Sequence, residues 1–162
     1  MDTPFKYPRT PHWPWSQTIH ADDKTHSSPE RFVGVPIVIT EKMDGGNTCL
    51  FNGEVFARST SAPSRNAWMS MVRKHHAHKT LLPEYKDIAL YGEDIFGIHS
   101  IEYNSVREEE TFMLFAAREG DRFLSYSNLI EISRDLDLNL VPVAFIGRLS
   151  SIDKITSFLT II

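Results

Sequence analysis

The most specific pattern in this 162-residue sequence is the segment Glu41-Lys42-Met43-Asp44-Gly45-Gly46-Asn47. The β-branched run at residues 35–41 predicts a strand that leads into it, and Asp-Gly-Gly predicts a turn whose glycines allow close approach to a ligand. A lysine is nucleophilic only as the neutral amine, so it needs a desolvated pocket or a nearby positive charge. The pattern therefore indicates a lysine nucleophile, with an ordinary charged hairpin turn as the alternative.

The residues around this segment predict a mixture of strands and helices. Asn52-Gly53 is a strong hairpin signal between predicted strands at 47–51 and 54–58. Further strands are predicted at residues 87–93, 111–118, 122–125 and 140–146. Helices are predicted at residues 64–78, 127–136 and 150–162, with Ser64, Ser127 and the Ser150-x-x-Asp153 pair as their caps. Strands with short links and interspersed helices indicate an α+β fold with antiparallel sheets.

The two ends of the chain differ from its middle. Residues 1–34 are rich in proline and polar residues, which predicts an irregular arm that docks through Trp13 and Trp15. Residues 148–162 predict a terminal amphipathic helix. With 41% hydrophobic and 23% charged residues, the chain has the composition of a globular protein, and its length suits one domain over residues 1–162.

Composition also bears on the compartment. No apolar run approaches the roughly 20 residues of a membrane span, and residues 1–31 lack the apolar core of a secretory signal. The only cysteine, Cys49, lies within a predicted strand, which favours an inert core thiol. These features predict a protein of the reducing cytoplasm.

Positive charge is concentrated between Val55 and Pro83, where acidic residues are absent. Such a stretch in a chain of net charge −4 indicates a local anion site, and a solvated basic helix face is the alternative. Three histidines in the same stretch, His75, His76 and His78, raise the question of zinc. Adjacent residues diverge by about 100° on a helix, and no cysteine or acid stands at ligand spacing, so zinc is disfavoured.

Four segments, in this order, resemble the motifs of the covalent nucleotidyltransferases, which comprise ATP-dependent DNA and RNA ligases and mRNA capping enzymes. They are EKMDGGN (41–47), FARSTSAP (56–63), LYGEDIFG (90–97) and FMLFAAR (112–118). Their combination most resembles the RNA ligase 2-like branch, and YPRTPHWPWS (7–16) resembles the amino-terminal arm of a bacterial subgroup. The resemblance implies the antiparallel-sheet fold of a ligase adenylation domain.

The resemblance also implies roles for seven residues. Lys42 would attack the α-phosphate of ATP and become lysyl-AMP, and Asp44 would shape the turn. The remaining five would hold the nucleotide: Glu41 by accepting from the adenine amine, Asn47 by holding a metal–water complex, Arg58 at the ribose and phosphate, Glu93 at the ribose hydroxyls, and Phe115 by stacking on adenine.

Three of these residues have plainer explanations. Phe115 alternates with Met113 along a predicted strand, so an ordinary core phenylalanine is an alternative to a stacking residue. Glu93 could serve the solubility of a strand end, and Arg58 could pair with Glu54 across the hairpin. One ATP site accounts for the whole set together, which favours the nucleotide site.

The function implied is that of an ATP-dependent RNA ligase that uses Mg²⁺ or Mn²⁺ to join 5′-phosphate and 3′-hydroxyl ends of RNA. Candidate RNA contacts in the basic stretch are Arg65, Arg73 and Lys74. The family's later Glu-Gly-x-Val and Lys-x-Lys strands have no counterpart after Gly147, so we expect a C-terminally incomplete domain that a further segment or partner chain completes. Alternatives are a catalytically impaired module that binds nucleotide or RNA ends, a structural subunit, and a DNA ligase or capping-type enzyme.

Overall fold

The computed structural model describes residues 3–16, 19–25, 28–97, 101–103 and 106–159. The chain divides into two compact units, and each is described by itself. The first unit comprises Met1–Tyr7 and Lys42–Val141, and the second comprises Pro8–Glu41 and Pro142–Ile162. Whether residues 1–162 act as one domain stays a prediction. No described helix is both long enough and apolar enough to cross a bilayer.

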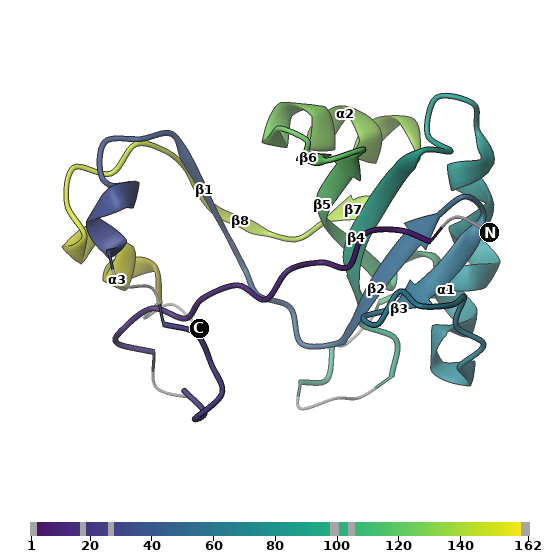
Figure 1. Cartoon of the computed structure of the whole chain (residues 1–162), viewed down its shortest axis with the longest axis horizontal. Helices are drawn as coiled ribbons and strands as arrows, with labels where there is room; N and C mark the ends of the chain where they lie inside the picture. Colours follow the sequence, from purple (N-terminus) through teal and green to yellow (C-terminus); the bar gives the residue numbers. More distant parts are fainter. Residues whose placement is uncertain (1–2, 17–18, 26–27, 98–100, 104–105, 160–162) are drawn as a thin grey trace. The chain divides into compact units, whose positions relative to one another are not determined.

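The first unit is built on one six-stranded sheet (Figure 1). The strand order is β3-β2-β4-β5-β6, and β7 pairs with β5 in parallel, whereas the other pairs are antiparallel. The strands are β2 (Gly46–Phe51), β3 (Glu54–Ala57), β4 (Ile88–Asp94), β5 (Phe112–Glu119), β6 (Arg122–Phe123) and β7 (Asn139–Leu140). The predicted α+β fold is confirmed, with one parallel pair that the sequence pattern did not indicate.

The predicted hairpin is confirmed. Asn52 and Gly53 both adopt positive φ, at 47° and 77°, which is the conformation of a two-residue turn that matches the twist of its strands. The Gly53 amide donates to the Thr80 hydroxyl at 2.8 Å. The hairpin β2–β3 is therefore fixed both by its own turn residues and by a distant threonine.

The two faces of the sheet are covered differently. One face carries the helices α1 (Ser70–His75) and α2 (Tyr126–Asp135), whose apolar residues share one core with β2, β4 and β5. The other face carries a smaller buried group of Cys49, Phe56, Ala89 and Tyr91. Burial raises the pKa of the Cys49 thiol well above its usual range, which agrees with the predicted inert thiol.

The second unit contains a two-stranded antiparallel ribbon of β1 (Ile37–Thr40) and β8 (Val143–Gly147), together with α3 (Asp153–Leu159). The arm within it is irregular, as predicted, apart from the short 3₁₀ helix Pro29–Phe32. Trp13 stacks on Trp15 with ring centroids 5.4 Å apart, and its edge meets the Phe32 ring. These contacts lie within the arm itself, so its docking through the two tryptophans stays a prediction.

The helix predicted at residues 64–78 is wrong in extent. The structure has three short pieces: the 3₁₀ helix Ala67–Met69, then α1, then the 3₁₀ helix Ala77–Leu81. The Ser64 amide donates to the Val55 carbonyl at 2.7 Å, and Pro63 bridges Phe56. This pairing with the edge of β3 holds Ser64 out of a helix start.

Three smaller predictions also need correction. Ser125, not Ser127, caps α2, because the Ser125 hydroxyl accepts from the Asn128 amide at 3.2 Å. The strand predicted at 140–146 is two strands, β7 and β8, which lie in different sheets on either side of Pro142. Helix α3 begins only at Asp153, so Ser150 does not cap it, and residues 160–162 lie outside the described range.

Candidate functional site

Lys42 lies in the link between β1 and β2, and its side chain is exposed. These two strands do not pair with each other, since β1 pairs with β8 whereas β2 pairs with β3 and β4. The alternative of an ordinary hairpin turn is therefore wrong. Met43, the next residue, is buried with Ile95 and Val141 and so anchors the link beside Lys42.

The turn after Lys42 is held against the end of β4. The Gly45 amide donates to Glu93 Oε1 at 3.2 Å. A Cβ atom on Gly45 would lie 2.3 Å from the backbone oxygen of Asp94, so only glycine permits this approach. The carboxylate of Glu93 and the lysine-bearing turn are thus joined directly.

Asp44 shapes the same turn from its other side. Its amide donates to the Tyr103 hydroxyl at 2.8 Å, and its carboxylate accepts from the Ile101 amide at 2.9 Å. Both contacts tie the turn to residues about 60 positions later in the chain. This agrees with the predicted turn-shaping role of Asp44.

Three of the predicted nucleotide-binding residues share one face of the sheet. Asn47 pairs in register with Glu93, and Glu93 pairs in register with Met113. Phe115 follows Met113 by two positions and packs, like Met113, against the group around Met43. The structure therefore brings Asn47, Glu93 and Phe115 together next to the turn that carries Lys42.

The other two predicted residues lie differently. Arg58 is exposed and follows Ala57, whose register partner is Thr48, so Arg58 leaves the sheet at the end that carries Asn47. Its proposed pairing with Glu54 is wrong, because Glu54 binds Arg65 at 2.9 Å. Glu41 falls in the second unit, where its amide donates to the Pro142 carbonyl at 2.9 Å.

The predicted RNA contacts each have a partner within the chain. Arg65 binds Glu54, and Lys74 binds Glu108 at 3.0 Å. The Arg73 guanidinium donates to the Ser64 carbonyl at 2.7 Å. Arg65 and Lys74 keep well over half of their side-chain surface exposed, so both remain accessible to a polyanion. Their contact with RNA stays a prediction.

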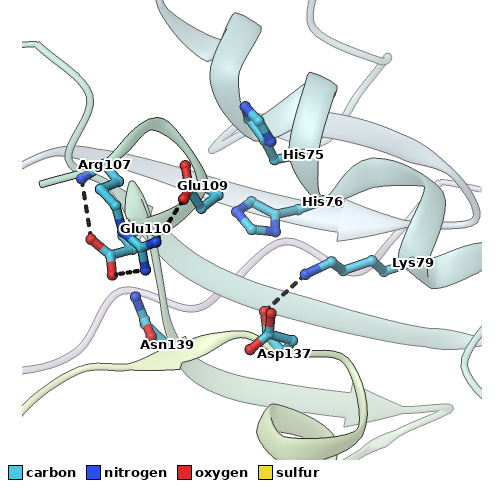
Figure 2. A pocket seen from close by; sticks show the side chains of 8 residues that line it. All are labelled: His75, His76, Lys79, Arg107, Glu109, Glu110, Asp137 and Asn139. Carbon is cyan, nitrogen blue, oxygen red and sulfur yellow. Dashed lines mark hydrogen bonds and ion pairs between the residues drawn. The ribbon is translucent and has the colours of Figure 1, made fainter.

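A polar pocket that the sequence did not predict lies beside the end of α1 (Figure 2). Its volume is about 260 Å³, and it is lined by His75, His76, Lys79, Arg107, Glu109, Glu110, Asp137 and Asn139. His76 is buried and contacts Phe112, with ring centroids 6.0 Å apart. Within the described ranges, no group of three or more His, Cys, Asp or Glu side chains is placed to hold a metal ion.

Solved structures similar to this chain include ATP-dependent polynucleotide ligases. A protein from Aquifex aeolicus assigned as an ATP-dependent DNA ligase matches 83% of this chain with a TM-score of 0.61 and 19% identity. An archaeal ATP-dependent RNA ligase matches 75% with a TM-score of 0.58 and 16% identity. The Naegleria gruberi RNA ligase K326A mutant, solved with ATP and Mn, matches 93% with a TM-score of 0.58 and 17% identity.

These likenesses establish the fold of a ligase nucleotidyltransferase domain. The RNA ligase family model matches residues 35–160, and this chain belongs to the RNA ligase family. The predicted resemblance is thereby confirmed. The chain spans 38%, 34% and 50% of the lengths of the three solved proteins. No curated protein matches it by sequence.

Proposed function

We propose that this chain is the adenylation unit of an ATP-dependent RNA ligase, in which Lys42 forms lysyl-AMP. The observation that carries the proposal is the direct contact between the Lys42-bearing turn and Glu93, at the edge of a sheet face that also presents Asn47 and Phe115. Family membership supports RNA as the polynucleotide. The AMP group would then pass to a 5′-phosphate end, and a 3′-hydroxyl would displace it.

The first step follows from the chemistry of these side chains. The neutral amine of Lys42 would form a bond to the α-phosphorus of ATP while the bond to the bridging oxygen breaks, releasing pyrophosphate and the amine proton. Phe115 offers an aromatic surface to adenine, and Glu93 offers carboxylate oxygens to hydroxyl donors. Arg58 adds a guanidinium, which suits phosphate oxygens because of its fixed fork of donors.

A divalent cation fits this donor set. Lys42 is exposed, and a lysine attacks only as the neutral amine, which nearby positive charge favours. Arg58 supplies a positive charge at this end of the sheet. The side-chain amide of Asn47 would contact the water shell of a divalent metal ion that arrives with the triphosphate. When bound, Mg²⁺ or Mn²⁺ would neutralise charge on the phosphate oxygens.

Incubation with α-labelled ATP and Mg²⁺ or Mn²⁺ tests the proposal. The chain should acquire a covalent label, and Lys42→Ala should abolish it. Lys86→Ala is the matched control, since Lys86 is an exposed lysine at the opposite end of β4 and should leave labelling unchanged. A label that maps to a peptide without Lys42 would contradict the assignment of the nucleophile.

A second candidate is a module that holds the nucleotide without transferring it. The exposure of Lys42 favours this candidate, because the described unit does not itself desolvate the amine. Calorimetric titration with ATP separates the two proposals. Saturable binding without covalent labelling under any metal condition would select the binding module, whereas labelling selects the ligase.

A further inference from the structure

Residues 3–7 lie over the sheet face that carries Phe115, and they are fastened there by three contacts. Pro4 is buried, and the Tyr91 hydroxyl donates to the Phe5 carbonyl at 2.6 Å. The Arg118 guanidinium carbon lies 3.4 Å from the centroid of the Phe5 ring, within the range of a cation–π contact. Tyr91 belongs to β4 and Arg118 to β5, so the segment is tied to both strands of the candidate site.

Tyr7, at the end of this segment, fills a space between three aromatic rings. Its ring centroid lies 5.0 Å from that of Phe115 and 5.6 Å from that of Phe123, each nearly perpendicular, and 5.3 Å from that of Tyr91. Edge-to-face pairs at these separations are favourable. Burial raises the pKa of the Tyr7 hydroxyl, which agrees with the enclosure of the side chain among these rings.

Phe115 packs against two groups of buried residues on this face. One is Met43 with Ile95 and Val141, and the other is Cys49, Phe56, Ala89 and Tyr91. A ring that must lie flat against a base needs a rigid neighbour to fix its orientation. Tyr7, with only two side-chain torsions and three aromatic contacts, is such a neighbour.

We propose that Tyr7 is a positioning residue of the nucleotide site, whose ring sets the orientation of Phe115 for stacking on the base of ATP. This inference rests on the proposed function of Phe115. The inference predicts the direction in which ATP binding changes when the Tyr7 ring is removed. The alternative, in which Tyr7 occupies the space of the base, predicts the opposite direction. Removal of a positioning ring weakens ATP binding, whereas removal of an obstructing ring strengthens it.

The test is the single-turnover rate of lysyl-AMP formation by the full chain, measured against ATP concentration. We expect Tyr7→Ala to raise the half-saturating ATP concentration about 5- to 30-fold, a part of what outright loss of base stacking brings. The maximal rate should change less than about twofold, because Phe115 does not touch the reacting phosphorus in this proposal. Tyr7→Phe should behave like the wild type, since it keeps the ring.

Leu129→Ala serves as the matched control. Leu129 is buried in α2 on the opposite, helix-covered face, so its truncation loosens the same unit without touching Phe115. We expect a lower melting temperature and an unchanged half-saturating ATP concentration. The inference is overturned if the half-saturating ATP concentration rises equally in Leu129→Ala. It is also overturned if this concentration is unchanged or lower in Tyr7→Ala.

The same experiment separates failure of this inference from failure of the proposed function. If the wild type forms lysyl-AMP and Tyr7→Ala matches it, only the inference fails. If the wild type binds ATP without becoming labelled, the calorimetric dissociation constant for ATP replaces the kinetic readout. We then expect this constant to be about 5- to 30-fold higher for Tyr7→Ala than for the wild type. If the wild type does not bind ATP at all, both proposals are overturned.

Discussion

His76 should make the stability of the first unit depend on pH. The residue is 2% exposed, and neither ring nitrogen makes a well-formed hydrogen bond with the part of the chain that the structure describes. Burial lowers the pKa of His76 to about 4, and the positive charge of Lys79 adds to this effect, whereas the Glu109 backbone opposes it. Protonation therefore favours the unfolded chain, in which this histidine has its ordinary pKa of about 6.5.

The size of the effect follows from these two pKa values. Stability is fully present above pH 6.5 and falls as the pH drops toward 4, because the unfolded state binds the proton first. One pKa unit corresponds to about 1.4 kcal/mol, so the loss between pH 7 and pH 5 is about 2 kcal/mol and the limiting loss is about 3 kcal/mol. The neighbouring His75 and His78 act in the same direction but contribute less to the pKa shift.

Urea unfolding at pH 7, 6 and 5 measures this loss. Other groups also titrate over this range, so the informative quantity is the slope of the unfolding free energy against pH, compared between wild type and His76→Leu. This variant removes the titrating group and puts an apolar side chain in its place. The control His78→Gln changes an exposed histidine two positions away and should retain the wild-type slope. Equal pH dependence in wild type and His76→Leu would refute the reasoning.

Two further outcomes are expected. Gly53→Ala should cost about 2 kcal/mol of unfolding free energy, because φ is +77° and the new Cβ would lie 2.7 Å from Leu81. Gly120→Ala should cost only about 1 kcal/mol, since φ is +55° there with open space around it, and equal losses would contradict this account. Glu41→Ala should reduce the preference for ATP over GTP in covalent labelling, because guanine presents a carbonyl where adenine presents an amine. Equal labelling of the wild type by both nucleotides would count against that role.

The parts of the fold that the sequence predicted are those fixed by local interactions. The β2–β3 hairpin is set by Asn52 and Gly53 themselves, and the irregular arm follows from its prolines and the stacking of Trp13 on Trp15. In each case neighbours in the chain set the local conformation, and the distant Thr80 hydroxyl only adds a hydrogen bond to a turn that the hairpin residues already favour. A pattern read along the sequence contains that information.

The errors arise where distant residues decide. The helical spacing after Ser64 is real, yet the hydrogen bond from Ser64 to Val55 delays the helix to Ser70. The apolar run at 140–146 has the pattern of one strand, but Pro142 divides it between two sheets. A strand partner cannot be identified from the run itself, because register is set by the sheet that receives it.

The candidate site shows the same contrast between features that the sequence motifs predict and features that depend on distant residues. The motif order was sufficient to select Asn47, Glu93 and Phe115, which the register then brings together. The role of Tyr7 in that site was not predicted, because its three ring contacts are with residues more than 80 positions away. The pocket around His76 was also missed, since the acids that line it come from later elements than the three histidines.

The positions of the two glycines that follow Asp44 differ in how strictly they require glycine, and the difference explains how the nucleophile is placed. A Cβ on Gly46 would meet the Trp68 ring at 2.2 Å, and a side chain can move aside. A Cβ on Gly45 would meet the Asp94 carbonyl at 2.3 Å, and that carbonyl belongs to β4, whose pairing with β2 and β5 holds it in place. Gly45 therefore lets backbone lie against backbone at the point where Glu93 accepts its amide, and this approach fixes Lys42 three residues earlier relative to the sheet.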